Sequence, residues 1–397
     1  MKDQLKEFRF ETKAIHSGSH PNHALNPPIF QTSTFTFDSI AHASAVMNFE
    51  SSDYVYTRGN NPTLRVLEEK MAELENGVGA VAFASGMAAV SSVLLSLLAP
   101  GECVLHHNVL YGSAYSFVTK FLEKYKIDAK GIDFTDISVL ENKIHTLRPK
   151  VIYFETPANP NLDIIDLESV AYLAKSVGAK VVVDNTFSSP YLQRPLTLGA
   201  DVVLHSATKY LGGHGDVVAG IAVARDMDYI NSLKFEYMCE LGGAMSPFNA
   251  WLILRGLKTL AVRMDRHCEN AMRLAAYLDK HPSISHVMYP GLDTHKNHEV
   301  AKKQMAQFGG IVSFEIKGSH EAAIEVINRF KLAKIAVSLG DTETLVQLPA
   351  AMTHIGYSDS ELKAIGLSKS LIRISVGLES IDDILEDVAQ ALNITNL

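Results

Sequence analysis

The chain has 397 residues, of which 47% are hydrophobic and 20% charged, a composition that fits a large globular protein and excludes a disordered or fibrous one. A formal net charge of -8 gives no electrostatic reason to expect nucleic acid as a partner. The three cysteines form no CxxC pattern, the amino terminus is charged, and no apolar run is long enough to span a bilayer. We therefore expect a cytoplasmic protein without a disulfide framework, a thiolate zinc site or a membrane partner.

The amino-terminal part is rich in turn-forming residues and shows little helical periodicity, so residues 1–62 are predicted to form an extended arm. Such an arm needs a surface on which to lie. The surface belongs either to the body of the same chain or to a neighbouring subunit, and the sequence leaves both open.

From about Leu64, short apolar strands alternate with helical stretches, which predicts a mostly parallel sheet flanked by helices in residues 63–250. The predicted strands are short and rich in Val, Ile or Ala. They are Ala80–Ala84, Cys103–His106, Val151–Glu155, Val181–Val183, Asp201–His205 and Gly220–Ala224.

A long helical region is predicted from Ala250 to about Tyr277, and strands are predicted at Gly309–Ile316 and Leu371–Val376. These elements predict a smaller carboxyl-terminal α/β domain over residues 251–397. The chain is therefore expected to consist of an arm and two α/β domains.

Polar or small residues follow several of the strands, at the edge where the carboxyl ends of a doubly wound sheet line a ligand crevice. Gly86 lies between a strand and a helix, where it serves either as a structural turn or as a close approach to an anion at the helix amino terminus. Asp184 follows a buried strand and is either a helix cap or the partner of a ring nitrogen. Lys209 follows another strand, and burial there lowers the pKa of an amine, which in its neutral form makes an imine with an aldehyde.

A lysine, a carboxylate and phosphate donors together are what a pyridoxal phosphate site requires. The chain resembles the Cys/Met-metabolism family of pyridoxal phosphate enzymes, which have fold type I, through motifs that follow one another in the same order over nearly the whole chain. The motifs are Pro28–Thr34, Tyr56–Arg58, Asn61–Thr63, Ser85–Met87, Glu155–Pro160, Val183–Thr186, His205–Tyr210 and Ser338–Gly340. The resemblance implies pyridoxal 5'-phosphate as the cofactor, a small sulfur amino acid as the substrate, and a homotetramer built from dimers.

The resemblance also implies a role for each matched residue. Lys209 holds the cofactor as a Schiff base and moves protons, and Asp184 pairs with the pyridinium nitrogen. The phosphate is bound by Gly86, Met87, Ser206 and Thr208, with Tyr56 and Arg58 reaching in from the neighbouring subunit. The remaining positions are Tyr111, which stacks on the ring and protonates the leaving group, Asn159, which contacts the phenolic oxygen, and Ser338 and Arg373, which bind the substrate carboxylate.

The valine at position 337 resembles the pattern of methionine gamma-lyases, which have an apolar residue at this position. Enzymes that act on cystathionine often have an acidic residue there. An apolar wall suits a methylthio group, although Val337 also fits a plain strand position. Ser113 departs from that pattern because methionine gamma-lyases usually carry a cysteine there, and the segment around Cys239 lacks an expected Lys-Asp pair. Residues 246–251 and 370–373 resemble O-acylhomoserine sulfhydrylases at least as much.

We therefore expect a carbon-sulfur lyase that converts methionine into 2-oxobutanoate, ammonia and methanethiol. O-acylhomoserine sulfhydrylase, a gamma-replacement transferase, and cystathionine gamma-lyase are the nearest alternatives. A divalent-metal hydrolase built on Asp184, His205, His214 and Asp216 is a weaker hypothesis, because their spacing matches no helical histidine pair. A non-enzymatic binding protein on the same fold is also weaker, because both Lys209 and Asp184 are present. No metal is predicted.

Overall fold

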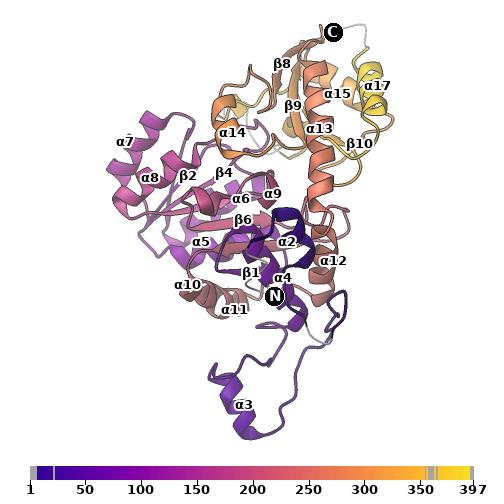
Figure 1. Ribbon diagram of the computed structural model, residues 1–397. Helices are drawn as coiled ribbons and strands as arrows, with labels where there is room; N and C mark the ends of the chain where they lie inside the picture. Colours follow the sequence, from indigo (N-terminus) through magenta and orange to yellow (C-terminus); the bar gives the residue numbers. More distant parts are fainter. Residues whose placement is uncertain (1–6, 21–22, 354, 356–361, 364, 394–397) are drawn as a thin grey trace.

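The computed structural model describes residues 7–20, 23–353, 355, 362–363 and 365–393. Two sheets organise this part of the chain, and Figure 1 shows helix α13 (Leu260–Leu278) running from the first sheet region toward the second. The first sheet uses residues between 79 and 224 and the second uses residues between 284 and 375. The sheets therefore lie on either side of residue 250, and the domain boundaries themselves stay a prediction. No helix among the described residues is both long and apolar enough to cross a membrane.

The first sheet has seven strands in the order β1-β7-β6-β5-β4-β2-β3. Every neighbouring pair is parallel except those that involve β7, which is antiparallel to both β1 and β6. Residues 207–219 join β6 to β7 without a helix, so the chain makes no crossover there and returns in the opposite direction. The strands are β1 (Gly79–Phe83), β2 (Cys103–His107), β3 (Asp128–Ile132), β4 (Val151–Glu155), β5 (Lys180–Asp184), β6 (Val202–Ser206) and β7 (Gly220–Ala224).

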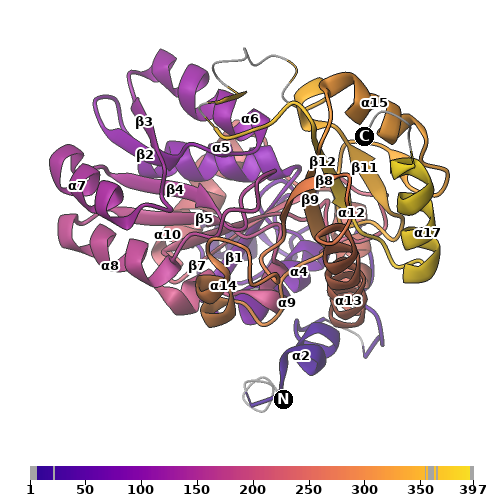
Figure 2. The same ribbon diagram turned by 90° about the horizontal axis from the view of Figure 1, so that it is seen from above.

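Helices cover both faces of this sheet (Figure 2). The side chains of a strand alternate between faces, and in β4 Ile152 and Phe154 enter one core while Val151 and Tyr153 enter the other. The first core also takes side chains from α4 (Pro62–Glu75), α7 (Ile137–Leu147), α8 (Leu167–Val177), α12 (Pro247–Leu257) and the start of α13. The second core takes them from α5 (Gly86–Leu97), α6 (Gly112–Ser116) and α10 (Met227–Ser232).

The second sheet has five strands in the order β10-β11-β12-β9-β8. A separate core joins it to the end of α13 and to α15 (His320–Asn328) and α17 (Ile381–Leu392). The strands are β8 (Ile284–Met288), β9 (Ile311–Ile316), β10 (Lys334–Ile335), β11 (Leu345–Gln347) and β12 (Leu371–Ser375). Apart from two helices of the amino-terminal arm, the remaining helices named in Figure 1 are α9 (Ser189–Leu192), α11 (Cys239–Leu241) and α14 (His298–Gln304).

All six predicted strands of the first sheet are present, with ends that differ by at most one residue. The edge strand β3 was not predicted, because its residues are mostly exposed and it lacks an apolar run. The long helical region predicted from Ala250 to about Tyr277 is present and consists of two helices in succession, α12 and α13. Thr259 departs from helical geometry between them, with φ -111° and ψ 7°.

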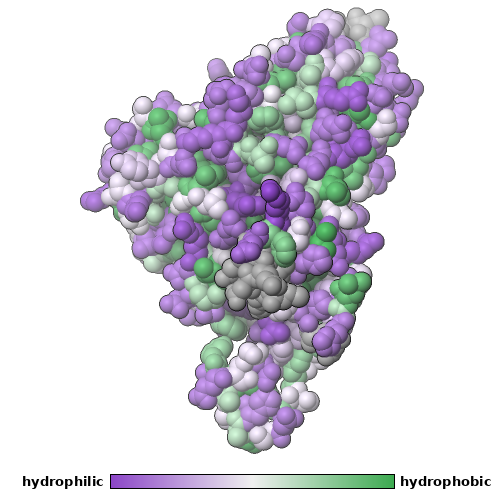
Figure 3. Space-filling model, in the orientation of Figure 1, coloured by the Kyte–Doolittle hydropathy of each residue, from purple (hydrophilic) through white to green (hydrophobic). Residues whose placement is uncertain are grey.

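The arm that was predicted to be extended contains two short helices, α2 (Phe10–His16) and α3 (Ile40–Met47). In α3 the side chain of Ser39 accepts a hydrogen bond from His42 N–H, which caps the helix start. The segment that carries α3 projects away from the body of the molecule (Figures 1 and 3). Much of the arm therefore lies on no surface of its own chain.

Candidate active site

The carboxyl ends of β1, β4, β5 and β6 lie at one edge of the first sheet, because these four strands run in the same direction. A cavity of about 420 Å³ opens at this edge and extends to the second sheet. Most of the predicted site residues line it. They are Gly86, Met87, Tyr111, Asn159, Asp184, Ser206, Thr208, Lys209, Val337, Ser338 and Arg373.

Lys209 lies in the turn that follows β6, and its Nζ donates a hydrogen bond of 2.7 Å to Ser338 Oγ. Burial and then the positive charge of Arg373 lower the pKa of Lys209 to about 8. Gly340 has φ +79°, and a Cβ there would lie 2.7 Å from Tyr210 N, so glycine allows the loop of Ser338 to approach the lysine. The structure therefore supplies an amine with an appreciable neutral fraction near neutral pH.

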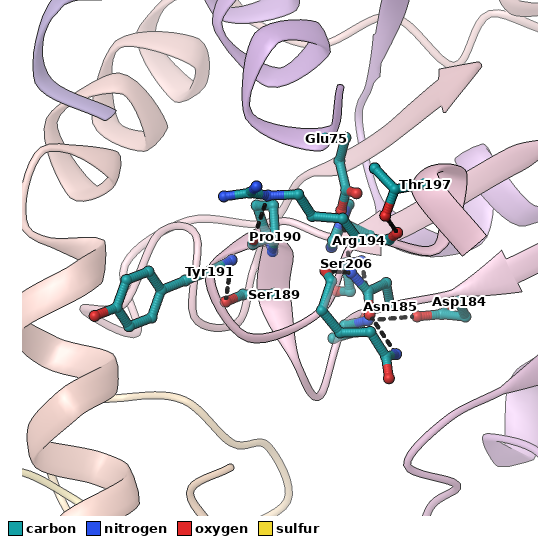
Figure 4. A network of polar contacts seen from close by, with 12 residues as sticks. Glu75, Asp184, Asn185, Ser189, Pro190, Tyr191, Arg194, Thr197 and Ser206 are labelled. Carbon is teal, nitrogen blue, oxygen red and sulfur yellow. Dashed lines mark hydrogen bonds and ion pairs between the residues drawn. The ribbon is translucent and has the colours of Figure 1, made fainter. Parts of the chain in front are cut away.

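Asp184 ends β5, where its Oδ1 accepts a hydrogen bond of 3.0 Å from Thr186 N–H. Burial raises the pKa of the Asp184 carboxyl, while hydrogen bonds from Thr186 act against this shift. Asn185 is held by Glu75, its Nδ2 donating to Glu75 Oε1 at 3.1 Å, and Figure 4 shows this network beside Asp184. The network fixes the end of the strand that presents the carboxylate.

Helix α5 begins at Gly86, and the side chain of Ser85 caps it by accepting a hydrogen bond from Ala88 N–H. The first N–H groups of a helix have no partner within it and favour an anion. A Cβ on Gly86 would lie 2.9 Å from the Cβ of Ser206, so only glycine fits there. Ser206 and Thr208, which carry hydroxyl groups, line the same cavity as Gly86.

Arg373 on β12 is buried, with 3% of its surface exposed. Its Nη1 donates to Asn159 Oδ1 and its Nη2 donates to the Ser338 carbonyl, each at 2.7 Å. Burial lowers the pKa of Arg373 to about 10, which leaves the guanidinium charged at neutral pH. The second sheet thus brings a fixed cation to a cavity that is formed mainly by the first.

Three predicted site residues are not among the cavity-lining residues of this one chain. Ser113 is exposed on α6, near the lining residue Ala114. Tyr56 and Arg58 lie on the arm, with the Arg58 guanidinium carbon 5.7 Å from the centre of the Tyr56 ring. Their prediction concerned the cavity of a neighbouring subunit, so it stays a prediction.

The residues of the metal hypothesis do not form a site. His205 Nε2 lies 2.6 Å from Glu75 Oε1, and His214 is exposed, with its Nδ1 2.8 Å from the Gly212 carbonyl oxygen. Within the described ranges, no group of three or more His, Cys, Asp or Glu side chains is arranged to hold a metal ion. The structure therefore gives this hypothesis no support.

Sequence reasoning assigned no role to Glu155 or Thr186, although both line the cavity. Each is a polar residue at or just beyond the end of a buried strand, the same signal that singled out Asp184. Gln347 was also missed. Its amide oxygen, when it faces Arg373, accepts hydrogen bonds of 3.2 Å from Nε and Nη1, and nothing in the local sequence indicates this contact.

The donor set of the cavity fits pyridoxal phosphate. The amino terminus of α5 and two hydroxyls suit a phosphate, Asp184 suits a pyridinium nitrogen, and Lys209 suits an aldehyde carbon. Gly86 keeps the phosphate end clear of any side chain.

Known proteins agree with this assignment. The model of the family described as Cys/Met metabolism PLP-dependent enzyme matches residues 11–393. L-methionine gamma-lyases from Fusobacterium nucleatum subsp. polymorphum and Pseudomonas putida are 45% and 46% identical to the chain, covering 98% and 96% of it and 99% and 97% of their own lengths. Cystathionine gamma-synthase from Mycobacterium leprae is 43% identical over 96% of both chains.

A solved structure agrees as well. The putative O-acetylhomoserine (thiol)-lyase of Campylobacter jejuni subsp. jejuni superposes with a TM-score of 0.93 at 32% identity, over 98% of this chain and all of its own length. That protein contains N'-pyridoxyl-lysine-5'-monophosphate. The likeness confirms the fold class expected from the resemblance. The chain belongs to the Cys/Met metabolism family of pyridoxal phosphate-dependent enzymes.

Proposed function

We propose that this enzyme is a methionine gamma-lyase, which converts L-methionine and water into 2-oxobutanoate, ammonia and methanethiol. The observation that carries the proposal is the charge distribution of the cavity lining. Among the described residues the lining holds two carboxyl side chains, and both are engaged: Asp184 with Thr186, and Glu155 with the N–H of Tyr111. Neither is free to pair with a second ammonium group on a substrate, and the wall at Val337 is apolar.

One observation favours a second candidate. A second hollow of about 510 Å³ shares Val337 and Ser338 with the cavity, and its lining includes Asp216 and Asp341. These carboxylates can attract the distal ammonium of a longer substrate such as cystathionine. Cystathionine gamma-lyase activity is therefore the alternative that the assay must include, together with sulfhydrylase activity on O-acetylhomoserine.

Each lining residue has a chemical task in this proposal. The cofactor, when bound, withdraws electrons from the substrate α-carbon. Arg373 binds the substrate carboxylate, helped by Ser338, and so fixes the orientation of that carbon. Lys209, with its lowered pKa, takes the α-proton, and Tyr111 donates a proton to the departing methylthio sulfur. Asp184 holds a proton on the ring nitrogen, while Gly86, Met87, Ser206 and Thr208 bind the phosphate and Asn159 the phenolic oxygen.

The test is a comparison of substrates with the purified holoenzyme. We expect equimolar 2-oxobutanoate and methanethiol from methionine, with a kcat/KM above those for cystathionine and for O-acetylhomoserine with sulfide. Absence of both methionine products, together with turnover of O-acetylhomoserine and sulfide, would contradict the proposal. A higher kcat/KM for cystathionine would favour the second candidate.

Val337→Glu is expected to shift the preference toward cystathionine. A carboxylate at this half-exposed position can pair with the distal ammonium of cystathionine. An exposed ion pair contributes up to about 1 kcal/mol. The kcat/KM for cystathionine, divided by that for methionine, should therefore rise about fivefold. Ile335→Glu is the matched control, because Ile335 is similarly exposed but does not line the cavity. An unchanged ratio in Val337→Glu, or an equal rise in both variants, would show that Val337 does not set the preference.

We propose further that the enzyme is a cytoplasmic homotetramer of two dimers, in which the arm lies against a neighbouring subunit. The support is the exposure of its apolar side chains: Leu25 is 92%, Ile40 84% and Phe49 73% exposed in the single chain. Apolar groups gathered on a projecting segment are typical of an interaction surface. The space-filling view in Figure 3 shows this segment standing clear of the body.

Coexpression of two inactive variants can test whether Arg58 serves the neighbouring cavity. Arg58→Ala with Lys209→Ala is expected to recover up to about a quarter of wild-type activity, because random pairing makes half of the dimers mixed and each mixed dimer holds one intact site. Asp184→Asn with Lys209→Ala is the control and should recover none, because both side chains line the cavity of their own chain. Equal activity in the two mixtures would place Arg58 outside a shared site.

A further inference from the structure

Glu155 lines the cavity with a buried carboxyl group, and the proposed reaction assigns this residue no task. It is the last residue of β4, and its register partner on the adjacent strand β5 is Asp184. Neighbouring strands lie about 4.8 Å apart and directly paired residues share a face of the sheet, and both side chains line the cavity. The sheet thus places two carboxyl groups side by side, and only 5% of Glu155 is exposed.

The contacts of Glu155 connect it to the elements that carry the cofactor groups. Its Oε1 accepts a hydrogen bond of 2.7 Å from the main-chain N–H of Tyr111. The main-chain N–H of Asn159 lies near the same carboxyl group and acts to lower its pKa. The side chain of Glu155 therefore fixes the backbone of Tyr111, the predicted ring-stacking residue.

Among the described residues, neither Glu155 nor Asp184 forms an ion pair. The cations of the cavity lining are held elsewhere, Lys209 by Ser338 and Arg373 by Asn159. The titratable groups that act on the two carboxyls are the buried phenol of Tyr153 on β4 and His205 on β6, whose charge acts on Asp184. Two adjacent buried carboxyls do not both ionise near neutral pH, so one of them keeps a proton.

The surroundings decide which carboxyl keeps it. Burial, followed by the negative charge of Asp184, raises the pKa of Glu155 well above its usual range, and the N–H groups of Tyr111 and Asn159 oppose this shift only in part. Burial raises the pKa of Asp184 less far, because hydrogen bonds from Thr186 and the charge of His205 favour its ionised form. The geometry therefore matches a neutral Glu155 beside a charged Asp184.

We propose that Glu155 is a positioning residue that acts as a neutral acid: it anchors the main chain of Tyr111 and leaves Asp184 as the single negative charge facing the ring nitrogen of the cofactor. This deepens the proposed function by adding a residue to the cofactor site, but it does not depend on which substrate the enzyme uses. Its tests below use no amino acid substrate, so their failure is distinguishable from a failure of the methionine assay.

The first test measures thermal unfolding of the protein freed of cofactor, for wild type and Glu155→Gln, from pH 5 to pH 7. In the unfolded wild type Glu155 releases its proton above pH of about 4.5, whereas the folded state retains it, so folding stability falls as pH rises toward the raised folded pKa. Glutamine cannot ionise and escapes this loss. The Tm of Glu155→Gln relative to wild type should therefore rise by roughly 1–2 °C per pH unit.

Ser313→Ala is the matched control. The buried hydroxyl of Ser313 donates a hydrogen bond of 2.7 Å to the Pro160 carbonyl oxygen and does not titrate. Its variant should therefore lose stability by an amount that does not change from pH 5 to pH 7. A Glu155→Gln difference that is equally flat would overturn the proposal.

The second test measures the dissociation constant of pyridoxal 5'-phosphate. Glu155→Gln keeps an oxygen acceptor for Tyr111 and changes no charge, so its dissociation constant should stay within about threefold of wild type, while Glu155→Ala removes the acceptor and should weaken binding by about tenfold, the effect of one lost buried hydrogen bond. A loss in Glu155→Gln as large as in Glu155→Ala would mean that Glu155 acts as a charge. No loss in Glu155→Ala would remove its anchoring role.

Discussion

Lys209→Ala is expected to lower kcat/KM on methionine by at least about 10³-fold, because a positioned acid-base group alone contributes about 10²- to 10⁴-fold. The variant also loses the amine that binds the cofactor covalently. Reduction of the wild-type holoenzyme with borohydride, followed by mass analysis of its peptides, should add the reduced cofactor to the peptide that contains Lys209. The variant should show no such addition at any position.

Lys180→Ala is the appropriate control for this experiment. Lys180 lies at the opposite end of the same sheet, where its Nζ pairs with Asp201 Oδ1 at 3.0 Å, and it is half exposed. Its replacement should leave both kcat/KM and the labelled peptide unchanged, since a surface ion pair contributes at most about 1 kcal/mol to stability. A labelled peptide that still appears in Lys209→Ala would assign the covalent bond to another lysine.

Asp184→Asn should produce the second largest loss, a fall in kcat of about 10²- to 10³-fold. Removal of one partner from a buried charge pair costs about 3–5 kcal/mol, and in this site the partner left alone is the protonated ring nitrogen. Asparagine is nearly the same size as aspartate and can still accept the hydrogen bond from Thr186 N–H. The loss is therefore expected from the charge, while the fold and the strand end stay in place.

The measurement combines kcat with an absorbance titration of the bound cofactor, which reports the protonation of its ring. Asp201→Asn is the control, because Asp201 accepts a hydrogen bond of 2.9 Å from Val181 N–H at the far end of β5 and lies away from the cavity. If Asp184→Asn keeps wild-type kcat and titration, the carboxylate does not serve the ring nitrogen, and a role for it as a strand-end cap would be sufficient.

The local sequence predicted those site residues that directly follow a buried strand. A strand followed at once by Asp184, and another followed by Ser206, Thr208 and Lys209, predicted a polar edge because the carboxyl ends of parallel strands meet there. The structure confirms this edge and the cavity that it lines. The family resemblance extended the prediction to residues remote in the chain, including Arg373.

Other features depended on contacts that no local pattern encodes. The motif Glu155–Pro160 indicates no role for Glu155, because its carboxyl becomes unusual only when β4 and β5 pair and place it beside Asp184. Gln347 faces Arg373 only because β11 and β12 are adjacent. The short helices of the arm were missed because helices of seven and eight residues carry little periodicity.

The sequence by itself determined the alternation of strands and helices, the positions of the reactive side chains at strand ends, and the family to which they belong, because these follow from residue type and order. Only the tertiary structure decided the chemical state of those side chains, because burial and the neighbouring charges set a pKa. It lowers the pKa of Lys209 to about 8 and raises that of Glu155 beside Asp184. A sequence names the ionisable groups, whereas the folded environment determines which of them carry charge.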